Sequence, residues 1–310
     1  MRIRHGLCVI LVLSALPSLG RDIFVDNRAG DDRSTGQQAR GTSETGPVRT
    51  LGRALCLAQN GDAITMANTG LVYHESISLV GSRLSGSPQR PFVLRGNGAF
   101  LDGSAPIPPE AWRPYEGGVF RFRPRLMSYQ QLFINDLPAS RVIATGASHR
   151  PPKLRPREWC LLDGQIYFCV EPGKLPRDYR LTCAAGRTGI TLFHVENVVI
   201  ADLTVQGFQL DGISAFNSVR GVSLVNVTCR GNGRSGVTVG GASAATIANS
   251  LLANNGTAQL LTLPYSETRL AATHLLSNSA PGWVEQGGRV FLNGKRIEGG
   301  LDEFRPTALP

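Results

Sequence analysis

Short runs in which apolar and polar residues alternate recur at a nearly fixed interval in the second half of the chain. Four such runs begin at Val198, Val222, Ala245 and Thr268, so successive starts are 24, 23 and 23 residues apart. In this register two columns are apolar, the first with Ile200, Leu224, Ile247 and Leu270, the second with Val205, Cys229, Leu252 and Leu275. Alternation with period two predicts strands, and the runs are too short and too rich in Val, Ile and Thr for helices.

Polar columns and a second set of strands accompany these runs. One polar column holds Asp202, Asn226 and Asn249, and another holds Asn232, Asn255 and Asn278. A shorter strand precedes each run: GITLF from Gly189, GISAF from Gly212, GVTVG from Gly236 and, more loosely, QLLTL from Gln259. A period in the low twenties with Gly and Asn corners predicts solenoid coils that bury their apolar columns by stacking. We interpret the polar columns as structural ladders at the corners, where side-chain amides bond to the next coil or to nearby backbone.

These repeats resemble the right-handed parallel β-helix proteins of the pectate-lyase-like superfamily. The resemblance implies an all-β fold, a right-handed parallel β-helix solenoid. Residues 21–105 are expected to form its N-terminal cap and first coils, with a strand at 22–27 and further strands in GDAITMAN, ESISLVGS and RPFVLRGNGAFLDG. A short amphipathic helix is predicted over 50–58, with Thr50 as its N-cap. Such a helix would cover the open edge and apolar core of the first coil.

The repeat is interrupted in the middle of the chain. Residues 106–187 are predicted to form an inserted antiparallel β subdomain of hairpins, one of them turning at Asp163-Gly164. Coils are expected again over 188–280, followed by a C-terminal hairpin and tail over 281–310. From Arg141 to Arg187 nine Arg and Lys residues face four Asp and Glu residues. Two interpretations stay open, an ordinary solvated surface or a patch that attracts a polyanion.

The first 20 residues have the pattern of a cleavable secretory signal peptide. Arg2 and Arg4 precede the apolar run LCVILVLSAL, and Ser18-Leu19-Gly20 supplies small residues for cleavage. The run is too short to span a bilayer, and the alternative is a buried N-terminal strand. Removing the segment lowers the formal net charge from +9 to +7, because it contains two Arg and no acidic residue. We therefore expect a secreted or periplasmic protein that does not stay in the membrane.

Cysteine spacing gives no metal site and no disulfide framework. Five cysteines follow the predicted signal peptide, and no pair of them has metal-ligand spacing. A turn at Gly164-Gln165 would bring Cys160 opposite Cys169, and the sequence leaves open whether that disulfide forms. No cofactor is predicted, and a Ca²⁺ requirement stays open with no motif to support it. A monomer is expected.

Candidate chemistry lies on the shorter strands. Side chains alternate along a strand, so with Ile190, Ile213 and Val237 inward, the next residues point outward. This predicts a polar row that contacts substrate, formed by Thr191, Ser214 and Thr238. Just before these strands lie three charged candidates for catalysis, Arg187, Asp211 and Arg234, on successive coils about 4.8 Å apart. His194 and Asn217 occupy matching positions at the far end of the strands, His194 as a further catalytic candidate and Asn217 as a substrate ligand.

Two interpretations of the charged group compete. In the first, the group cleaves a uronide by β-elimination, which needs a cation against the C6 carboxylate and a base for the C5 proton. In related lyases an Arg or Lys serves as that base, and His194 competes for the role here. In the second, Arg187, Asp211 and Arg234 form a salt-bridge ladder between coils, and His194 is a turn residue.

A hydrolase is less well matched. Hydrolysis needs two carboxylates flanking the glycosidic bond, and Asp211 has no convincing partner on the outer face. Leu210-Asp211-Gly212-Ile213 resembles the Asp-Gly-Ile step of polygalacturonases, and the strand at 233–240 resembles their later Gly-His-Gly strand. Ser235 stands at the position of that His, and the paired Asp and the Arg-Ile-Lys motif are missing. The polygalacturonase type is therefore only a second alternative.

The sequence as a whole favours a carbohydrate-active protein whose partner is a polysaccharide, with an acidic polysaccharide preferred. The first hypothesis is an exported polysaccharide lyase-like enzyme. The alternative is a non-catalytic β-helix that binds polysaccharide or has a structural role at the cell surface. Nucleic acid is not expected as a partner, because no recognised nucleic-acid module is present.

Overall fold

The computed structural model describes residues 20–299 except 42–43, 126–128, 145–148 and 278. The predicted signal peptide therefore lies almost entirely outside the described residues. Strands dominate, with one short α-helix and two 3₁₀ turns. No helix in the described ranges is both long and apolar enough to cross a bilayer.

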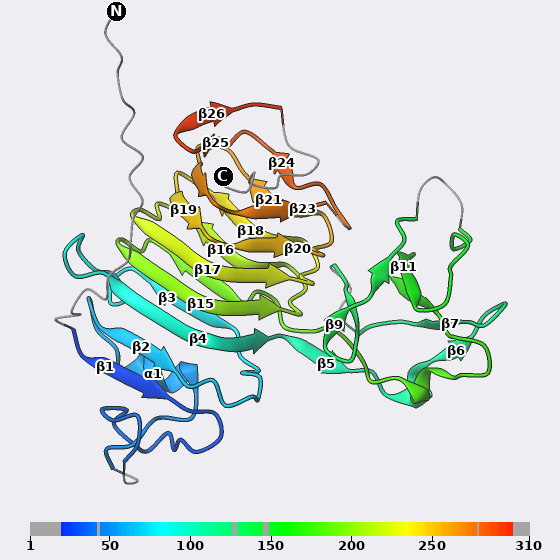
Figure 1. Ribbon diagram of the computed structural model, residues 1–310, viewed down its shortest axis with the longest axis horizontal. Helices are drawn as coiled ribbons and strands as arrows, with labels where there is room; N and C mark the ends of the chain where they lie inside the picture. Colours follow the sequence, from blue (N-terminus) through cyan, green and yellow to red (C-terminus); the bar gives the residue numbers. More distant parts are fainter. Residues whose placement is uncertain (1–19, 42–43, 126–128, 145–148, 278, 300–310) are drawn as a thin grey trace, which may run out of the picture.

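Sheet A contains the long repeat strands, which pair in parallel from one repeat to the next (Figure 1). β15 and β17 pair residue by residue over most of their length. After Ala248 the long strands are split in two, so that β20 and β23 continue β19 and β22. The last neighbours, β25 and β26, form an antiparallel hairpin. The strands are β1 (Asp22–Val25), β2 (Ala63–Met66), β4 (Phe92–Asp102), β15 (Val198–Gln206), β17 (Val222–Arg230), β19 (Ala244–Ala248), β20 (Leu251–Ala253), β22 (Glu267–Ala271), β23 (His274–Leu276), β25 (Arg289–Leu292) and β26 (Lys295–Ile297).

Sheet B contains the shorter repeat strands, and all of its neighbours are parallel. β3 pairs directly with β14, although 109 residues lie between Val80 and Ile190. The predicted insert, residues 106–187, is part of this intervening segment. The insert therefore leaves the stack uninterrupted. In spatial order the strands are β3 (Ile77–Val80), β14 (Ile190–Phe193), β16 (Asp211–Phe216), β18 (Ser235–Gly240), β21 (Ala258–Thr262) and β24 (Trp283–Glu285).

The apolar columns predicted from the repeat meet in register. Ile200 pairs with Leu224, which pairs with Ile247, and Ile247 pairs with Leu270. Leu94 of β4 extends this column by one coil toward the N-terminus. All of these side chains are buried in one continuous core between sheets A and B. Because each buried aliphatic side chain contributes about 1.5–3 kcal/mol relative to exposure, the core depends on every coil covering its neighbour.

The first polar column marks a bend in the long strands. Asp202, Asn226 and Asn249 have left-handed backbones with φ of 55°, 52° and 51°, and Asn97 of β4 joins them with φ of 52°. Asn and Asp tolerate this conformation better than other non-glycine residues. Asn226 also donates from Nδ2 to Oδ1 of Asp202 over 2.7 Å. Ala272, where the sequence pattern breaks, keeps the bend with φ of 44°.

The second polar column is buried inside the stack. Asn232 and Asn255 are fully buried, and Oδ1 of Asn255 accepts hydrogen bonds from the backbone N of Asn232 over 2.9 Å and its Nδ2 over 3.1 Å. Oε1 of Gln259 accepts from Nδ2 of Asn255 and so continues the ladder. Buried amides satisfied in this way cost little, whereas an unpaired one would cost about 1–3 kcal/mol. Asn278, the third predicted member, lies outside the described residues.

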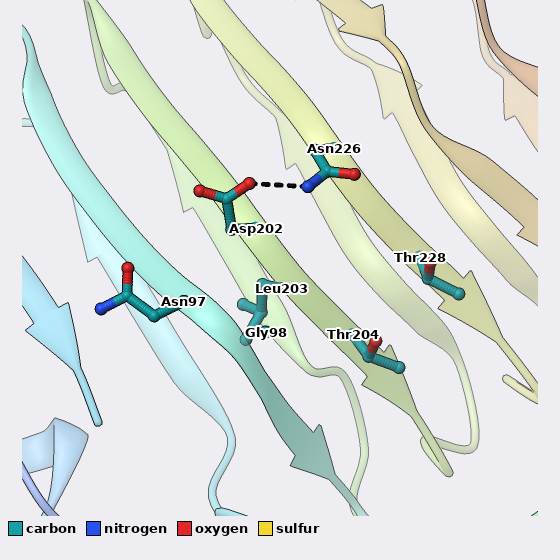
Figure 2. A pocket seen from close by; sticks show the side chains of 7 residues that line it. All are labelled: Asn97, Gly98, Asp202, Leu203, Thr204, Asn226 and Thr228. Carbon is teal, nitrogen blue, oxygen red and sulfur yellow. Dashed lines mark hydrogen bonds between the residues drawn. The ribbon is translucent and has the colours of Figure 1, made fainter. Parts of the chain in front are cut away.

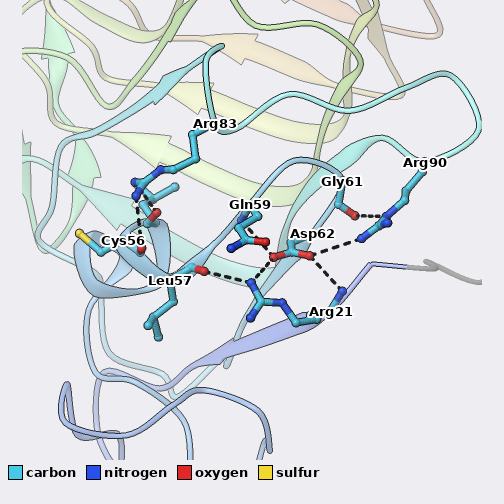
Figure 3. A network of polar contacts seen from close by, with 9 residues as sticks. Arg21, Cys56, Leu57, Gln59, Gly61, Asp62, Arg83 and Arg90 are labelled. Atoms are coloured by element: carbon cyan, nitrogen blue, oxygen red, sulfur yellow. Dashed lines mark hydrogen bonds and ion pairs between the residues drawn. The ribbon is translucent and has the colours of Figure 1, made fainter.

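A short helix and a buried carboxylate stabilise the N-terminal end of the coil stack. α1 (Leu51–Leu57) confirms the predicted helix, and Thr50 caps it by accepting from Arg53 N. Leu51 and Ala54 of α1 are part of the core. Figure 3 shows Asp62, which is 2% exposed, accepting hydrogen bonds from the backbone N and Nη2 of Arg21 and from Gln59 N. Arg90 lies 3.7 Å from the same carboxylate. These contacts join the first strand to the loops that follow α1 and precede β4.

The strands between β4 and β14 are mostly antiparallel and form two small sheets beside the stack (Figure 1). One is built on β7, β11 and β12, and the other on β8 and β13. Their aromatic core, around Trp159 and Phe168, is separate from the core of the coils. The strands are β5 (Ser104–Pro106), β6 (Arg113–Pro114), β7 (Val119–Phe122), β8 (Leu132–Ile134), β9 (Leu137–Pro138), β10 (Ser140–Arg141), β11 (Glu158–Leu162), β12 (Gln165–Cys169) and β13 (Leu181–Ala184).

The disulfide that the sequence left open does not form. Asp163 and Gly164, both with positive φ, make the turn between β11 and β12, so Leu162 pairs with Gln165. Cys160 is consequently opposite Tyr167 rather than Cys169, since a turn at Gly164-Gln165 would have been needed to align the two thiols. Cys56, Cys160, Cys169, Cys183 and Cys229 are all free.

Candidate functional site

The outer face of sheet B carries the predicted polar row, although only part of the row is accessible. Thr191, Ser214 and Thr238 lie side by side on β14, β16 and β18. Thr191 and Ser214 are half-buried, whereas Thr238 is only 1% exposed. The prediction that Thr238 points to substrate is therefore wrong. Its Oγ1 donates to Oδ1 of Asp211 over 3.0 Å, so the hydroxyl is used inside the protein.

Asp211 begins β16 and is the centre of a buried network. Arg234 holds its carboxylate in a two-pronged pair, Nε to Oδ1 over 2.9 Å and Nη2 to Oδ2 over 2.6 Å. Ser235, at the position of the polygalacturonase His, donates from Oγ to Oδ1 over 2.8 Å. Asp211 is 1% exposed, and its hydrogen bond to Arg234 raises the pKa of that guanidinium. These contacts occupy both oxygens of the buried carboxylate, so neither is open to a substrate.

Arg187 and Arg234 lie just before β14 and β18, at the end of sheet B where its strands begin, and they are two coils apart. We call this end of the sheet the arginine edge. Backbone hydrogen bonds of 2.8 Å join Leu210 N to Arg187 O and Arg234 N to Leu210 O, which places Leu210 between the two arginines. Asp211 is one residue beyond Leu210, and of the two arginines it binds Arg234. The proposed three-member ladder is thus a pair. Arg187 is exposed and has no ion pair within the described ranges, so its guanidinium faces solvent.

His194 and Asn217 occupy the other end of the same strands. They follow β14 and β16, both have positive φ, and His194 N donates to Asn217 O over 3.0 Å. Arg187 and His194 are seven positions apart along the chain, a span of about 23 Å when extended at 3.3 Å per residue. The structure therefore does not bring His194 to the charged edge. Its ring instead packs edge-on against Phe193, with centroids 4.3 Å apart.

An exposed apolar ladder, missed in the sequence analysis, lies between these two ends. Val80, Phe193 and Phe216 close β3, β14 and β16 and pair directly across the coils. Their exposed fractions, 43%, 36% and 41%, are high for large apolar side chains aligned on a flat sheet. The signal was present in GITLF and GISAF, whose terminal Phe has the same outward parity as the Thr or Ser two residues earlier. Apolar rings and hydroxyls therefore share one face.

Acidic residues are scarce on sheet B. Its six strands contain only Asp211 and Glu285, which lie on β16 and β24, three coils apart and at opposite ends of their strands. Three coil spacings amount to about 14 Å, which exceeds the 5–9.5 Å that separates the carboxylates of glycosidases. Across the described part of the chain, no group of three His, Cys, Asp or Glu side chains is placed to hold a metal ion.

A shallow groove of about 390 Å³ lies elsewhere, along the bend of sheet A (Figure 2). The left-handed residues Asn97, Asp202 and Asn226 form one side, and Thr204 and Thr228 form the other. Asp202 and Asn226 bond to each other across adjacent coils, as the predicted corner ladder requires. This groove is a consequence of the bend, and it contains none of the sequence-predicted site residues.

Comparison with known proteins gives structural neighbours only. No protein-family model matches the chain, and no curated protein matches its sequence. A solved glycoside hydrolase is 12% identical with a TM-score of 0.55, and the alignment covers 81% of this chain and 73% of that one. XylC in complex with xylose is 12% identical over 91% of this chain and 73% of that one, with a TM-score of 0.44. The GH136 lacto-N-biosidase from Eubacterium ramulus is 11% identical over 87% and 56%, with a TM-score of 0.23. At this identity, the likeness to the glycoside hydrolase concerns the fold.

Proposed function

We propose that this chain is a carbohydrate-active right-handed parallel β-helix protein that binds an acidic polysaccharide across the outer face of sheet B. The observation that carries the proposal is the composition of that face. An apolar ladder of Val80, Phe193 and Phe216 runs beside the hydroxyls of Thr191 and Ser214. Sugar rings present apolar C–H faces and a rim of hydroxyls, and aromatic faces with adjacent polar groups complement both. The fold shared with a solved glycoside hydrolase agrees with this class of function.

The acidic character of the ligand is proposed from the arginine edge. Arg187 is exposed and free of ion pairs within the described ranges, and Arg234 uses only Nε and Nη2 on Asp211. Guanidinium groups bind carboxylates through paired N–H donors, so a uronic acid fits this edge better than a neutral sugar does. A polysaccharide chain lying along the strands would place some of its rings on the ladder and the carboxylate of another residue of the chain at the arginine edge.

Of the two cleavage reactions, β-elimination fits these residues better than hydrolysis, because sheet B lacks a carboxylate pair. In this reaction Arg234 would neutralise the C6 carboxylate, and Arg187 would first release a proton to solvent and then accept the C5 proton as a neutral guanidine. The C5–H electron pair becomes the C4–C5 double bond, the C4–O bond breaks, and the departing oxygen takes a proton. A non-catalytic binding protein is the competing function, and the fully occupied Asp211 is the observation that favours it.

The test combines binding with two product assays. Purified protein is incubated with polyuronates and with neutral polysaccharides, and unsaturated products are followed by their ultraviolet absorbance and new reducing ends by a colour reaction. Loss of the absorbance change in Arg187→Gln, measured at a polysaccharide concentration that still saturates the variant, would support elimination. Reducing ends without unsaturated product would indicate hydrolysis. Binding without either product would leave the non-catalytic function.

Matched variants test the face itself. Phe193→Ala and Phe216→Ala are expected to weaken polysaccharide binding severalfold, since each removes a stacking surface. Leu71→Ala is the control, because Leu71 is a similarly exposed apolar side chain, 55% exposed, outside sheet B. Equal binding by all three variants would contradict the assignment of this face.

Export remains part of the proposal. The predicted signal peptide ends at Gly20, next to Arg21, whose backbone N contacts the buried Asp62. Cleavage there would convert this N–H into a charged amine beside the carboxylate. N-terminal sequencing of the protein recovered from the extracytoplasmic fraction should begin at or near Arg21, and recovery of the uncleaved chain in the cytoplasm would contradict export.

A further inference from the structure

Three arginines surround a shallow hollow on the inserted sheets. Arg113 lies on β6, Arg121 on β7 and Arg123 directly after β7, and we refer to them as the arginine face. Together with Ala111, Phe122 and Gln165 they line a hollow of about 380 Å³. Figure 1 shows β6 and β7 on the side of the insert away from the coil stack, so this hollow is separate from the outer face of sheet B.

The backbone forces these charges together. β6 and β7 are antiparallel, and Arg113 pairs directly with Arg121. Arg123 is two residues beyond Arg121 and therefore has the same parity along the strand. Like charges directly opposite each other on neighbouring strands destabilise a sheet. Repulsion between Arg113 and Arg121 thus destabilises the sheet in the free protein, and a bound anion would relieve it.

No carboxylate in the described ranges forms an ion pair with the arginine face. Instead, Arg113 donates from Nη1 to Glu110 O over 2.7 Å and to Trp112 O over 3.5 Å. Arg123 donates from Nη2 to Asp163 O over 3.5 Å, while the Asp163 carboxylate is 3.2 Å from Nδ1 of His149. Carbonyl oxygens orient the guanidinium groups without neutralising them, so positive charge remains at the hollow.

Aromatic residues lie in and beside the hollow. The Arg121 guanidinium lies 5.9 Å from the ring centroid of Tyr115, and that ring packs edge-on against Tyr167 at 5.2 Å. Tyr115 is 38% exposed, and Phe122 is half-buried at the lining. Apolar surface, an amide from Gln165 and three forked cations together complement a sugar ring that bears an anionic group.

We infer that the arginine face binds carboxylate or sulfate groups of a polyanionic polysaccharide, as an anchor distinct from the outer face of sheet B. The choice of a polysaccharide as the anion carrier rests on the proposed function, whereas the anion site itself does not. A chain held at both places would be bound more tightly than at either one, because the second contact is made within the same complex.

The test compares two triple variants of the full chain. Arg113→Gln, Arg121→Gln and Arg123→Gln together remove the arginine face. Lys153→Gln, Arg155→Gln and Arg177→Gln remove the same charge from exposed positions elsewhere on the insert. Affinity for a polyuronate and for a sulfated glycosaminoglycan is measured at several salt concentrations, with a single-stranded DNA of similar length as a further probe.

The first triple variant is expected to bind the polysaccharides about tenfold more weakly, since three exposed charge contacts of about 0.5 kcal/mol each sum to roughly that factor. Its salt dependence should also be shallower, while the control variant binds like the parent. Equal losses in both triples, or no loss in the first, would overturn the inference, as would a loss seen with DNA only. Carboxylate and sulfate sources are separated by which polysaccharide loses more affinity.

Two further readouts keep this inference apart from the proposed function. The thermal midpoint of the first triple variant should equal or exceed that of the parent, because the repulsion between Arg113 and Arg121 is gone; a lower midpoint would contradict the claim of unneutralised charge. Phe193→Ala and Arg187→Gln should weaken binding without changing the effect of the triple variant on salt dependence. If those sheet B variants have no effect and the triple variant does, the arginine face stands while the proposed function fails.

Discussion

The coils and the insert use polar side chains in opposite ways. In the coils, buried charges and amides find partners within the stack: Asp211 with Arg234, Asn232 with Asn255, and Asp62 with Arg21. In the insert, three arginines gather on one face, where they contact backbone carbonyls and a tyrosine ring and form no ion pair within the described residues. The coils are thus stabilised by their polar groups, whereas the insert exposes polar groups that remain available to a ligand.

The cores differ as well. The coil core is one continuous and mostly aliphatic cluster, in which the side chains of one coil pack on those of the next. The insert has two small clusters, the larger one dominated by Trp112, Trp159 and Phe168. Nearest-neighbour stacking spreads stability along a solenoid, while a small aromatic cluster concentrates it in a few side chains. The difference predicts that the insert can lose its structure while the coils keep theirs.

The largest expected effect is that of Trp159→Ala. Trp159 is fully buried, and its Nε1 donates to Ala139 O over 3.1 Å. The substitution should cost about 3–5 kcal/mol within the insert, as truncation of a buried aromatic residue does. Hydrogen exchange should then show loss of protection in β7, β11 and β12, with β15 and β17 unchanged.

Phe92→Ala provides the reciprocal case, because Phe92 is fully buried in the coil core. It should lower protection in β4 and β15 first. If Trp159→Ala lowers protection in β15 as much as in β11, the two regions unfold as one unit and the comparison fails.

The coils were predictable from the sequence because their physics repeats. Each apolar column, each left-handed Asn and each inward Ile occurs several times, so one register explains all of them, and the structure pairs Ile200 with Leu224 as that register requires. The insert has no repeat to fix its register. The sequence allowed two turns one residue apart: the turn at Asp163-Gly164, which forms, places Cys160 opposite Tyr167, whereas a turn at Gly164-Gln165 would have placed it opposite Cys169.

The second-largest effect concerns the ion pair between Asp211 and Arg234. Asp211→Ala should lower the free energy of unfolding by about 2–3 kcal/mol, since Arg234 keeps a charge without its partner and two hydroxyls lose their acceptor. The Arg234 side chain is 28% exposed, which places the value below that of a fully buried pair. Arg187→Ala, which removes an exposed and unpaired arginine, should change stability by less than about 0.5 kcal/mol. Similar urea midpoints for the two variants would show that Asp211 is not structural.

The candidate site was only partly predictable, and the reason is side-chain reach. Thr191 and Ser214 are partly exposed, as strand parity predicts, but parity does not say which outward groups bind each other. Thr238 turns to Asp211, and Arg234 reaches back one coil to the same carboxylate, leaving Arg187 alone. His194 was separated from the charged edge by strand length alone. These outcomes depend on distances between particular side chains, which an alignment of the repeats does not give.

A third, smaller effect is a change of stability with pH at the N-terminal end of the coils. Burial raises the pKa of Tyr73 from its ordinary 10.0 to about 12, and its hydroxyl donates to Ala67 O over 2.8 Å. Because the folded pKa lies above the unfolded one, this contribution is complete below pH 10 and is lost as pH rises toward 12. Tyr73→Phe should flatten the fall in stability over that window, and Tyr265→Phe, at an exposed position, should not. Parallel pH profiles for the parent and Tyr73→Phe would contradict the assignment.

The smallest effect is chemical and tests both regions with one reagent. Burial raises the pKa of Cys160 to about 11 and of Cys183 to about 12 in the insert, and it raises the pKa of Cys229 in the coils. Cys56 on α1 is exposed. Since the thiolate is the reactive form, alkylation of the folded chain starting at residue 21 should modify Cys56 rapidly and the other four slowly. Denaturation without reductant should then expose four further thiols; two fewer would mean that Cys160 and Cys169 are bridged. In Trp159→Ala, Cys160 and Cys169 should become reactive while Cys229 stays protected. The reactivity of individual thiols would thus show that the insert unfolds while the coils stay folded.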